Sequence, residues 1–240
     1  MTSTAVDRPG LSEPSGLQLM ETPPPRGADA IPVLEGRHVR LKPVDASDYP
    51  FLVALQTNPE NLIRWRYRGT TPSPEQIVQT LWQGVLAQFL IVRADTNEPV
   101  GLVVGYNPEF RHGYIYLAQI VTPKCERSGW AFEADALFIT YLFEAFPFEK
   151  IYLEVIEFNY RKLASGAGTL FHVEGCLIDH EYHLGRRWHL YTLAIYRREW
   201  PQIIERVAPY LAAHPDRLRP CAPDRSRRTP GSSGHPPTGQ

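Results

Sequence analysis

Hydrophobic and polar positions repeat with two different periods in the middle of the chain, and each period predicts its own kind of element. HVRLKPV at 38–44 alternates apolar with polar side chains, which predicts a strand. Asp45 then indicates a helix start, as an N-cap with Asp48 at the third helical position. A second helix is expected from Ser73, with an apolar stripe near period 3.6 made of Ile77, Val78, Leu81, Trp82 and Val85.

The following elements are expected to be mostly strands. We predict strands over 89–94, 100–106, 113–121, 150–157, 174–182 and 188–196, and helices over 129–145, 160–171 and 200–213. DTNEP, between the first two of these strands, has the turn residues of a hairpin loop. This order predicts an α+β fold with a mixed, mostly antiparallel sheet flanked by helices, and it differs from a Rossmann repeat.

Proline divides the chain into a central domain and two tails. Of the 23 prolines, 6 lie in residues 1–32 and another 6 in residues 214–240. Neither tail has the periodic apolar residues that would offset the entropy of ordering a chain. We therefore expect disorder over 1–32, one domain over 33–213, and a disordered tail rich in Pro and Arg over 214–240.

The net charge and the cysteine content indicate which partners and which cell compartment to expect. Twenty-five Lys and Arg oppose 26 Asp and Glu, a net charge of −1, so no global field favours nucleic acid or an anionic membrane. The arginine-rich tail leaves one alternative, an RNA-associated enzyme, although nucleic acid is not the expected partner. Three cysteines without ligand spacing, no apolar leader and no long apolar stretch predict a cytoplasmic protein without a membrane partner.

The strand over 113–121 and the helix that follows it carry the first chemical signal. ERSGWAFEA at 126–134 places Gly129 at a helix start, where backbone N–H groups and the helix dipole favour an anion such as a pyrophosphate. Arg127 beside the glycine could add a charge-assisted contact. An ordinary strand-to-helix turn explains the same residues, so this element needs support from elsewhere in the sequence.

Six separated motifs supply that support. They are GRHVRLKPVDASDYP at 36–50, EPVGLVVGYNP at 98–108, SGWAFEADALFITYLFEAF at 128–146, VIEFN at 155–159, FHVEGCL at 171–177 and HLYTLAIYRREW at 189–200. In this order they resemble the GCN5-related N-acetyltransferase (GNAT) superfamily, in particular its ribosomal-protein alanine acetyltransferase-like branch. The resemblance implies a sheet splayed between two parallel central strands, with acetyl-CoA in the gap and an amine as acyl acceptor.

The resemblance also implies which residues bind acetyl-CoA. The gap would lie between 113–121 and 150–157, with the backbone of Ile120 and Val121 pairing with the pantetheine arm and Asn159 near it. The pyrophosphate would be held by the backbone N–H groups of Arg127, Ser128, Gly129, Trp130 and Ala131. Glu126 departs from the family pattern, because an anion stands where the phosphate loop usually has Arg or Gln.

Direct attack on the thioester requires a deprotonated amine, so a proton acceptor is expected on the strands that line the gap. Glu154 and Glu157 are the titratable candidates, and Gln119 could position a water. The tyrosine that protonates the leaving thiolate in many family members is replaced by Gly166, and Lys162 stands where a serine is frequent. Either the thiolate leaves unassisted or Tyr160 serves as the acid; the alternative is a non-catalytic acyl-CoA-binding module.

Four other features of the sequence have both a structural and a functional interpretation. His180, His183 and His189 do not have the HExxH spacing, so we expect no metal site. RWRYRG at 64–69 is either an acceptor wall or a packed loop, and Cys125 either a reactive thiol or a small core residue. The stripe on 200–213 either covers the sheet or joins a homodimer. The acceptor amine and the acyl length stay open.

Overall fold

The computed structural model describes residues 34–62, 65–66, 68–125 and 128–211. The predicted tails, Glu126 and Arg127 therefore lie outside the described residues. Within the described residues, seven strands form one sheet in the order β1-β2-β3-β4-β5-β7-β6. The strands are β1 Val39–Pro43, β2 Val85–Arg93, β3 Pro99–Glu109, β4 Tyr114–Val121, β5 Lys150–Ile156, β6 His172–His183 and β7 Arg186–Tyr196.

Every neighbouring pair of strands is antiparallel except β4 and β5, which are parallel. The helices are α1 Tyr49–Thr57, α2 Pro59–Leu62, α3 Pro74–Thr80, α4 Trp130–Ala145, α5 Glu157–Leu163 and α6 Trp200–Leu211, with 3₁₀ turns η1 Ala46–Asp48, η2 Pro123–Cys125 and η3 Ala164–Gly166. The prediction of a mixed, mostly antiparallel α+β fold is thus confirmed.

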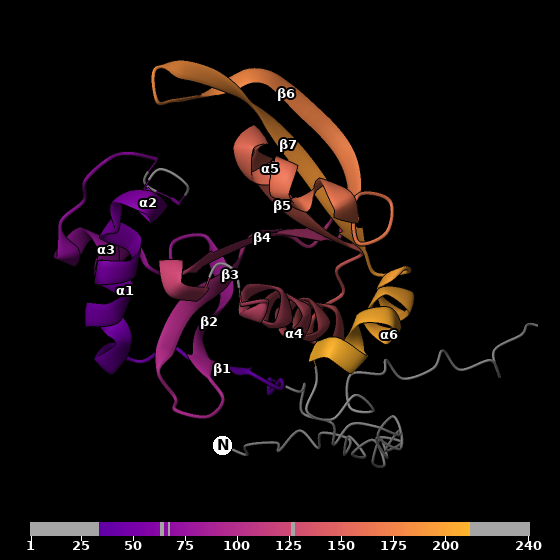
Figure 1. Cartoon of the computed structure of the whole chain (residues 1–240), viewed down its shortest axis with the longest axis horizontal. Coiled ribbons are helices and arrows are strands. Elements are labelled where there is room, and N and C mark those ends of the chain that lie inside the picture. The colour runs from indigo at the N-terminus through magenta and orange to yellow at the C-terminus, as the bar shows by residue number, and fades with distance from the viewer. Residues whose placement is uncertain (1–33, 63–64, 67, 126–127, 212–240) are drawn as a thin grey trace, which may run out of the picture. The chain divides into compact units, whose positions relative to one another are not determined.

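The two faces of the sheet carry separate hydrophobic clusters. Figure 1 shows α4 and α6 together, apart from the group formed by α1, α2 and α3. Phe138 and Leu142 of α4 are completely buried in the larger cluster, which also contains Ile204 of α6. Leu52 and Leu55 of α1 lie in the smaller cluster on the opposite face. We call the first the α4 face and the second the α1 face.

The first half of the apolar stripe of α6 is buried inside the chain. Trp200, Ile203 and Ile204 belong to the cluster on the α4 face, and the Trp200 indole N–H donates to Thr140 Oγ1 at 3.1 Å. The described part of the stripe, as far as Val207, therefore covers its own domain, while a homodimer stays a prediction. None of the helices in the described part of the chain is long and apolar enough to span a membrane.

The second predicted helix was too long. α3 ends at Thr80, Gly84 has φ +68°, and Val85 opens β2 in place of completing a helical stripe. Trp82, expected on the apolar stripe, is 51% exposed. The helix start was correct: Ser73 accepts the Gln76 N–H at 3.3 Å, and the Gln76 side chain accepts the Ser73 N–H at 2.9 Å, a capping box.

The predicted helix over 160–171 was misplaced as well. α5 begins at Glu157 and ends at Leu163, and η3 follows it to Gly166. β6 starts at His172, so Gly166 and Gly168 lie in the connection between α5 and β6. Glu157 and Asn159 consequently belong to a helix and not to the end of β5.

Candidate active site

β4 and β5 pair only over the first part of their length. The register pairs Tyr114 with Lys150, Ile115 with Ile151, and Tyr116 with Tyr152. Beyond these pairs, residues 117–121 pair with β3 alone, and residues 153–156 pair with β7 alone, among the described residues. The two central strands therefore separate after Tyr116 and Tyr152, as predicted, and leave backbone N–H and C=O groups along the gap available to a ligand.

The turn that follows β4 leads into the start of α4. Gly129 is the residue before the helix, with φ +79° and open space where a side chain would be. Gly129 itself has no side chain that could cap the N–H groups at the start of the helix. Ser128 Oγ accepts the Trp130 N–H at 3.2 Å and donates to the Cys125 carbonyl at 2.8 Å, which fixes the turn. This arrangement suits an anion.

Gln119 and Ile120 lie on opposite faces of β4. The Gln119 amide donates to the Ala131 carbonyl at 2.8 Å and so ties the strand to the first turn of α4. Ile120 is buried on the α1 face, and Val121 packs against the cluster on the α4 face. The predicted cofactor-binding residues 120–121 and 128–131 are thus brought together at one end of the gap.

The α1 face carries a group of tyrosines where the gap opens. Ring centroids are 5.6 Å apart for Tyr106 and Tyr116 and 5.5 Å apart for Tyr116 and Tyr152. Glu154 follows Tyr152 on the same side of β5. Burial, together with the negative charge of Glu154, raises the pKa of Tyr106 to about 12 and also raises the pKa of Tyr116. We call Tyr106, Tyr116, Tyr152 and Glu154 the tyrosine face.

Arg68 borders the tyrosine face from the loop between α2 and α3. Its guanidinium lies 3.9 Å from the Glu154 carboxylate and forms an ion pair with Glu181 of β6. The other described residues of RWRYRG are structural: Trp65 is buried and donates to Gln56, and Arg66 donates to the Thr80, Leu81 and Gln83 carbonyls. The segment is therefore both a packed loop and a border of the face.

Glu157, Asn159 and Tyr160 all lie on α5, beyond the end of β5. Glu157 pairs with Arg161 one turn later, and this contact lowers the pKa of the carboxyl. Tyr160 stacks on Tyr191 of β7, with ring centroids 4.0 Å apart. Gly166 has no room for the tyrosine of the family pattern, because an added Cβ would lie 2.9 Å from Phe171.

Glu133, inside the helix motif, has a structural position. The side chain is buried. Its Oε1 accepts the His38 backbone N–H at 3.0 Å, and its Oε2 lies 3.0 Å from Nδ1 of the His38 ring. A Cβ at Gly36 would come within 2.1 Å of Glu133 Oε1, so a larger residue there would displace the carboxylate from its present position. Glu133 thus joins α4 to β1, away from the gap.

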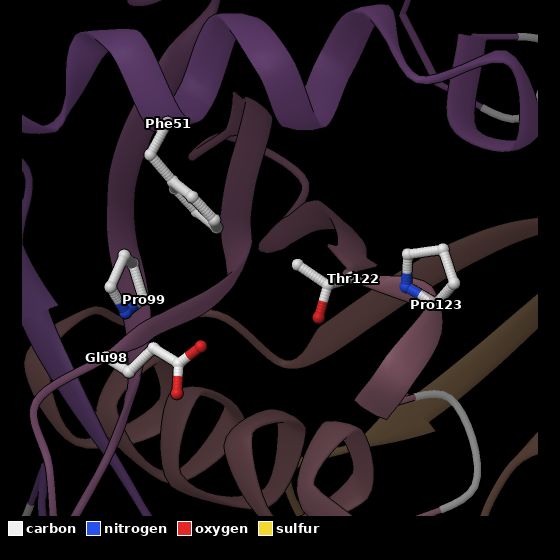
Figure 2. Close-up of a pocket in the computed structure, with 5 residues that line it drawn as sticks. All are labelled: Phe51, Glu98, Pro99, Thr122 and Pro123. Atoms are coloured by element: carbon white, nitrogen blue, oxygen red, sulfur yellow. The ribbon is translucent and has the colours of Figure 1, made fainter.

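A separate cavity of about 410 Å³ lies beside the end of β4. Figure 2 shows Phe51, Glu98 and Pro99 on one side of it, and Thr122 and Pro123 on the other. The Glu98 carboxylate disfavours a phosphate in this cavity.

The remaining sequence candidates have ordinary surroundings. The described residues contain no group of His, Cys, Asp or Glu that could hold a metal ion. His189 Nδ1 instead accepts the Asp179 N–H at 3.0 Å. Cys125 is buried, with its Sγ 3.3 Å from the Thr122 hydroxyl.

The sequence did not point to Tyr106, Tyr116, Tyr152 or Glu181 as site residues, whereas Arg68 lies within RWRYRG, the segment expected to be an acceptor wall or a packed loop. The alternation of buried and half-exposed positions along a strand could have pointed to two of the tyrosines, because Tyr116 and Tyr152 each occupy a half-exposed position. Nothing local to Arg68 or Glu181 indicates that β6 and the α2–α3 loop meet.

Comparison with solved structures shows the same fold. The spermidine N-acetyltransferase from Vibrio cholerae in complex with CoA and spermine matches with a TM-score of 0.60 and 20% identity, covering 68% of this chain and 97% of that one. The spermidine/spermine N-acetyltransferase from Vibrio cholerae in complex with manganese ions matches with a TM-score of 0.58 and 18% identity, covering 68% and 95%. At such identities the likeness establishes the fold.

Sequence comparison establishes the family. No curated protein matches the chain significantly. The family model described as "Acetyltransferase (GNAT) domain" matches residues 38–164, more than half of the chain. With the splayed β4–β5 pair and the open start of α4, this match shows that the chain belongs to the GNAT acetyltransferases and is an acetyl-CoA-dependent N-acetyltransferase.

Proposed function

We propose that this enzyme acetylates a small cationic amine that approaches the thioester from the tyrosine face. The observation that carries the proposal is the position of Glu154, immediately past the point where β4 and β5 separate, beside Tyr152 and Tyr116. A carboxylate among aromatic rings attracts an ammonium group through charge and through the ring faces.

The backbone along the gap and the start of α4 fit acetyl-CoA, which supplies the activated acetyl thioester. Backbone groups along residues 117–121 are available to pair with the pantetheine arm, as an added strand would. The helix start from Ser128 to Ala131, with its open glycine, would hold the phosphates. Arg127 and Asn159 stay predicted members of this site.

Glu154 would accept the proton that the amine must lose before it attacks. The phenols of Tyr106 and Tyr116 are protonated near neutral pH, and the rise in their pKa values strengthens this, so they can orient the amine but do not act as bases. Both predicted candidates have an arginine nearby, but Glu154 lies on β5 just past the last β4–β5 pair, whereas Glu157 lies on α5 beyond the strand, so Glu154 is the stronger candidate. Tyr160 stays a candidate acid for the leaving thiolate.

Arg68 suggests which kind of amine fits. Its guanidinium lies between Glu154 and Glu181, so this place accommodates a cation held by two carboxylates. A polyamine would place one amino group at the thioester and a second ammonium beside Glu181, where it would displace the Arg68 guanidinium. The spermine bound to the structural relative agrees with this class. The finer resemblance, to ribosomal-protein alanine acetyltransferases, would instead require a peptide N-terminus.

Steady-state kinetics with spermidine, a monoamine of similar length and a peptide with N-terminal alanine tests the proposal. We expect spermidine to have the highest kcat/KM and Glu154→Gln to lower kcat by about 100-fold or more. Glu157→Gln is the matched control and should change kcat by less than about threefold. Preference for the peptide, or equal rates for Glu154→Gln and wild type, would contradict the proposal.

A further inference from the structure

Asp135, in the second turn of α4, is a carboxyl group that the fold itself does not use. Its Oδ1 is buried and has no hydrogen-bond partner among the described residues. Burial alone raises the pKa of this side chain to about 8, so the group carries its proton near neutral pH. The residue as a whole retains partial exposure, which places it at the margin of the core and not at its centre.

Helix geometry shows which way this side chain faces. Glu133 points from α4 toward β1, where it contacts His38. At 3.6 residues per turn, Asp135 is about 200° further around the helix and points away from β1. Ala131, one turn earlier on nearly the same side as Asp135, accepts the hydrogen bond from Gln119 of β4. Asp135 therefore lies on the flank of α4 beside the part of β4 that borders the gap.

An apolar side chain would suit this position better if packing were its only role. A buried polar atom without a partner destabilises a fold, and native proteins retain few of them. The surrounding helix positions Ala134, Phe138 and Leu142 are all apolar and completely buried. The missing partner of Asp135 is thus best sought in a ligand that enters the gap.

We propose that Asp135 binds acetyl-CoA by a hydrogen bond to an amide of its pantetheine arm. This inference rests on the proposed placement of acetyl-CoA between β4 and β5. A protonated carboxyl has one donor and further acceptor capacity, and each pantetheine amide has a carbonyl and an N–H, so the two groups are complementary. The neutral form also adds no negative charge beside an anionic cosubstrate.

Calorimetric titration of the full-length protein with acetyl-CoA, together with the melting temperature of the free protein, tests this role. Asp135→Leu should weaken acetyl-CoA binding by about 10-fold while the free protein melts at the same or a higher temperature. Asp135→Asn keeps a donor and an acceptor and should bind within about threefold of wild type. If Asp135 had only a structural role, Asp135→Leu would not weaken acetyl-CoA binding while the melting temperature stays the same or rises.

Thr140→Val provides the matched control on the same helix. Thr140 is buried and accepts the Trp200 indole N–H on the side toward α6, so its loss should lower the melting temperature and leave acetyl-CoA affinity unchanged. If Asp135→Leu fails to fold, Asp135→Ala takes its place with the same expected loss of affinity. Wild-type affinity in the folded Leu or Ala variant would overturn the inference.

Gly129→Glu separates this inference from the placement on which it rests. The variant puts a strained, negatively charged residue at the α4 start and should abolish binding. Binding lost in Gly129→Glu but unchanged in Asp135→Leu would overturn the role of Asp135 alone. Binding unchanged in both variants would overturn the placement of acetyl-CoA as well.

Discussion

At the scale of single residues, Asp135 makes the stability of the domain depend on pH in an unusual direction. Its pKa is about 8 in the folded chain against an ordinary value of 3.8, so between these values the folded state binds more protons than the unfolded state. Its contribution to the free energy of unfolding therefore falls as pH rises from 4 to 8. Asp45 behaves oppositely: Lys42 lowers its pKa to about 2, so its contribution is lost as pH falls from about 4 toward 2.

We therefore predict that Asp135→Asn removes a negative slope from the stability profile. Between pH 5 and pH 8, the free energy of unfolding of wild type relative to the variant should fall by about 2–4 kcal/mol. Urea denaturation at a series of pH values measures this difference, and the comparison cancels Asp45 and other shared carboxyls. Parallel profiles for the two proteins would show that Asp135 is not a buried, protonated acid.

At the scale of elements, the C-terminal end of α4 depends on a residue more than fifty positions away. Arg197, after β7, donates to the carbonyls of Phe143, Phe146 and Phe148. The last carbonyls of a helix have no partner inside it, and a cation also suits the negative end of the helix dipole. Arg197 thus fixes α4, whose opposite end is the proposed phosphate site, against the end of β7.

Replacing Arg197 with Met should lower the free energy of unfolding by about 3 kcal/mol, because three carbonyls lose a charged donor at once. Arg198→Met is the matched control: Arg198 is exposed, pairs with Glu199 and should contribute less than about 1 kcal/mol. Urea denaturation of both variants measures the difference. Equal losses would mean that the carbonyls find other partners and that Arg197 does not anchor α4.

Element types were predictable from the sequence more often than element ends. The strand over 113–121 and the helix over 129–145 correspond closely to β4 and α4, because each has a clear period and a turn residue at its end. Val85 was misassigned because it fits a helical stripe equally well, and the positive φ of Gly84 decides in favour of a strand. Arg197 gave no signal, since its partners are determined by tertiary contacts.

At the scale of the whole molecule, the splayed pair of strands is what the sequence motifs predicted best. The resemblance implied a gap between 113–121 and 150–157, and the β4–β5 pairing confirms it. The tyrosine face was not predicted, because it combines residues of β3, β4 and β5 and is bordered by the α2–α3 loop. Alternation places a tyrosine on one side of its strand, but only the sheet order shows which tyrosines become neighbours.

The same splayed pair predicts how acetyl-CoA changes the dynamics of the sheet. Backbone amides of residues 117–121 that do not face β3 have no strand partner across the gap within the described residues and should exchange hydrogen rapidly in the free protein. Bound acetyl-CoA should slow their exchange by about 10-fold or more, whereas Tyr116, within the paired part of β4, should change little. Hydrogen–deuterium exchange with mass spectrometry measures both segments in one experiment, and Gly129→Glu serves as the binding-deficient control. Protection that spreads evenly over the whole sheet would indicate general stabilisation and contradict pairing of the cosubstrate with β4.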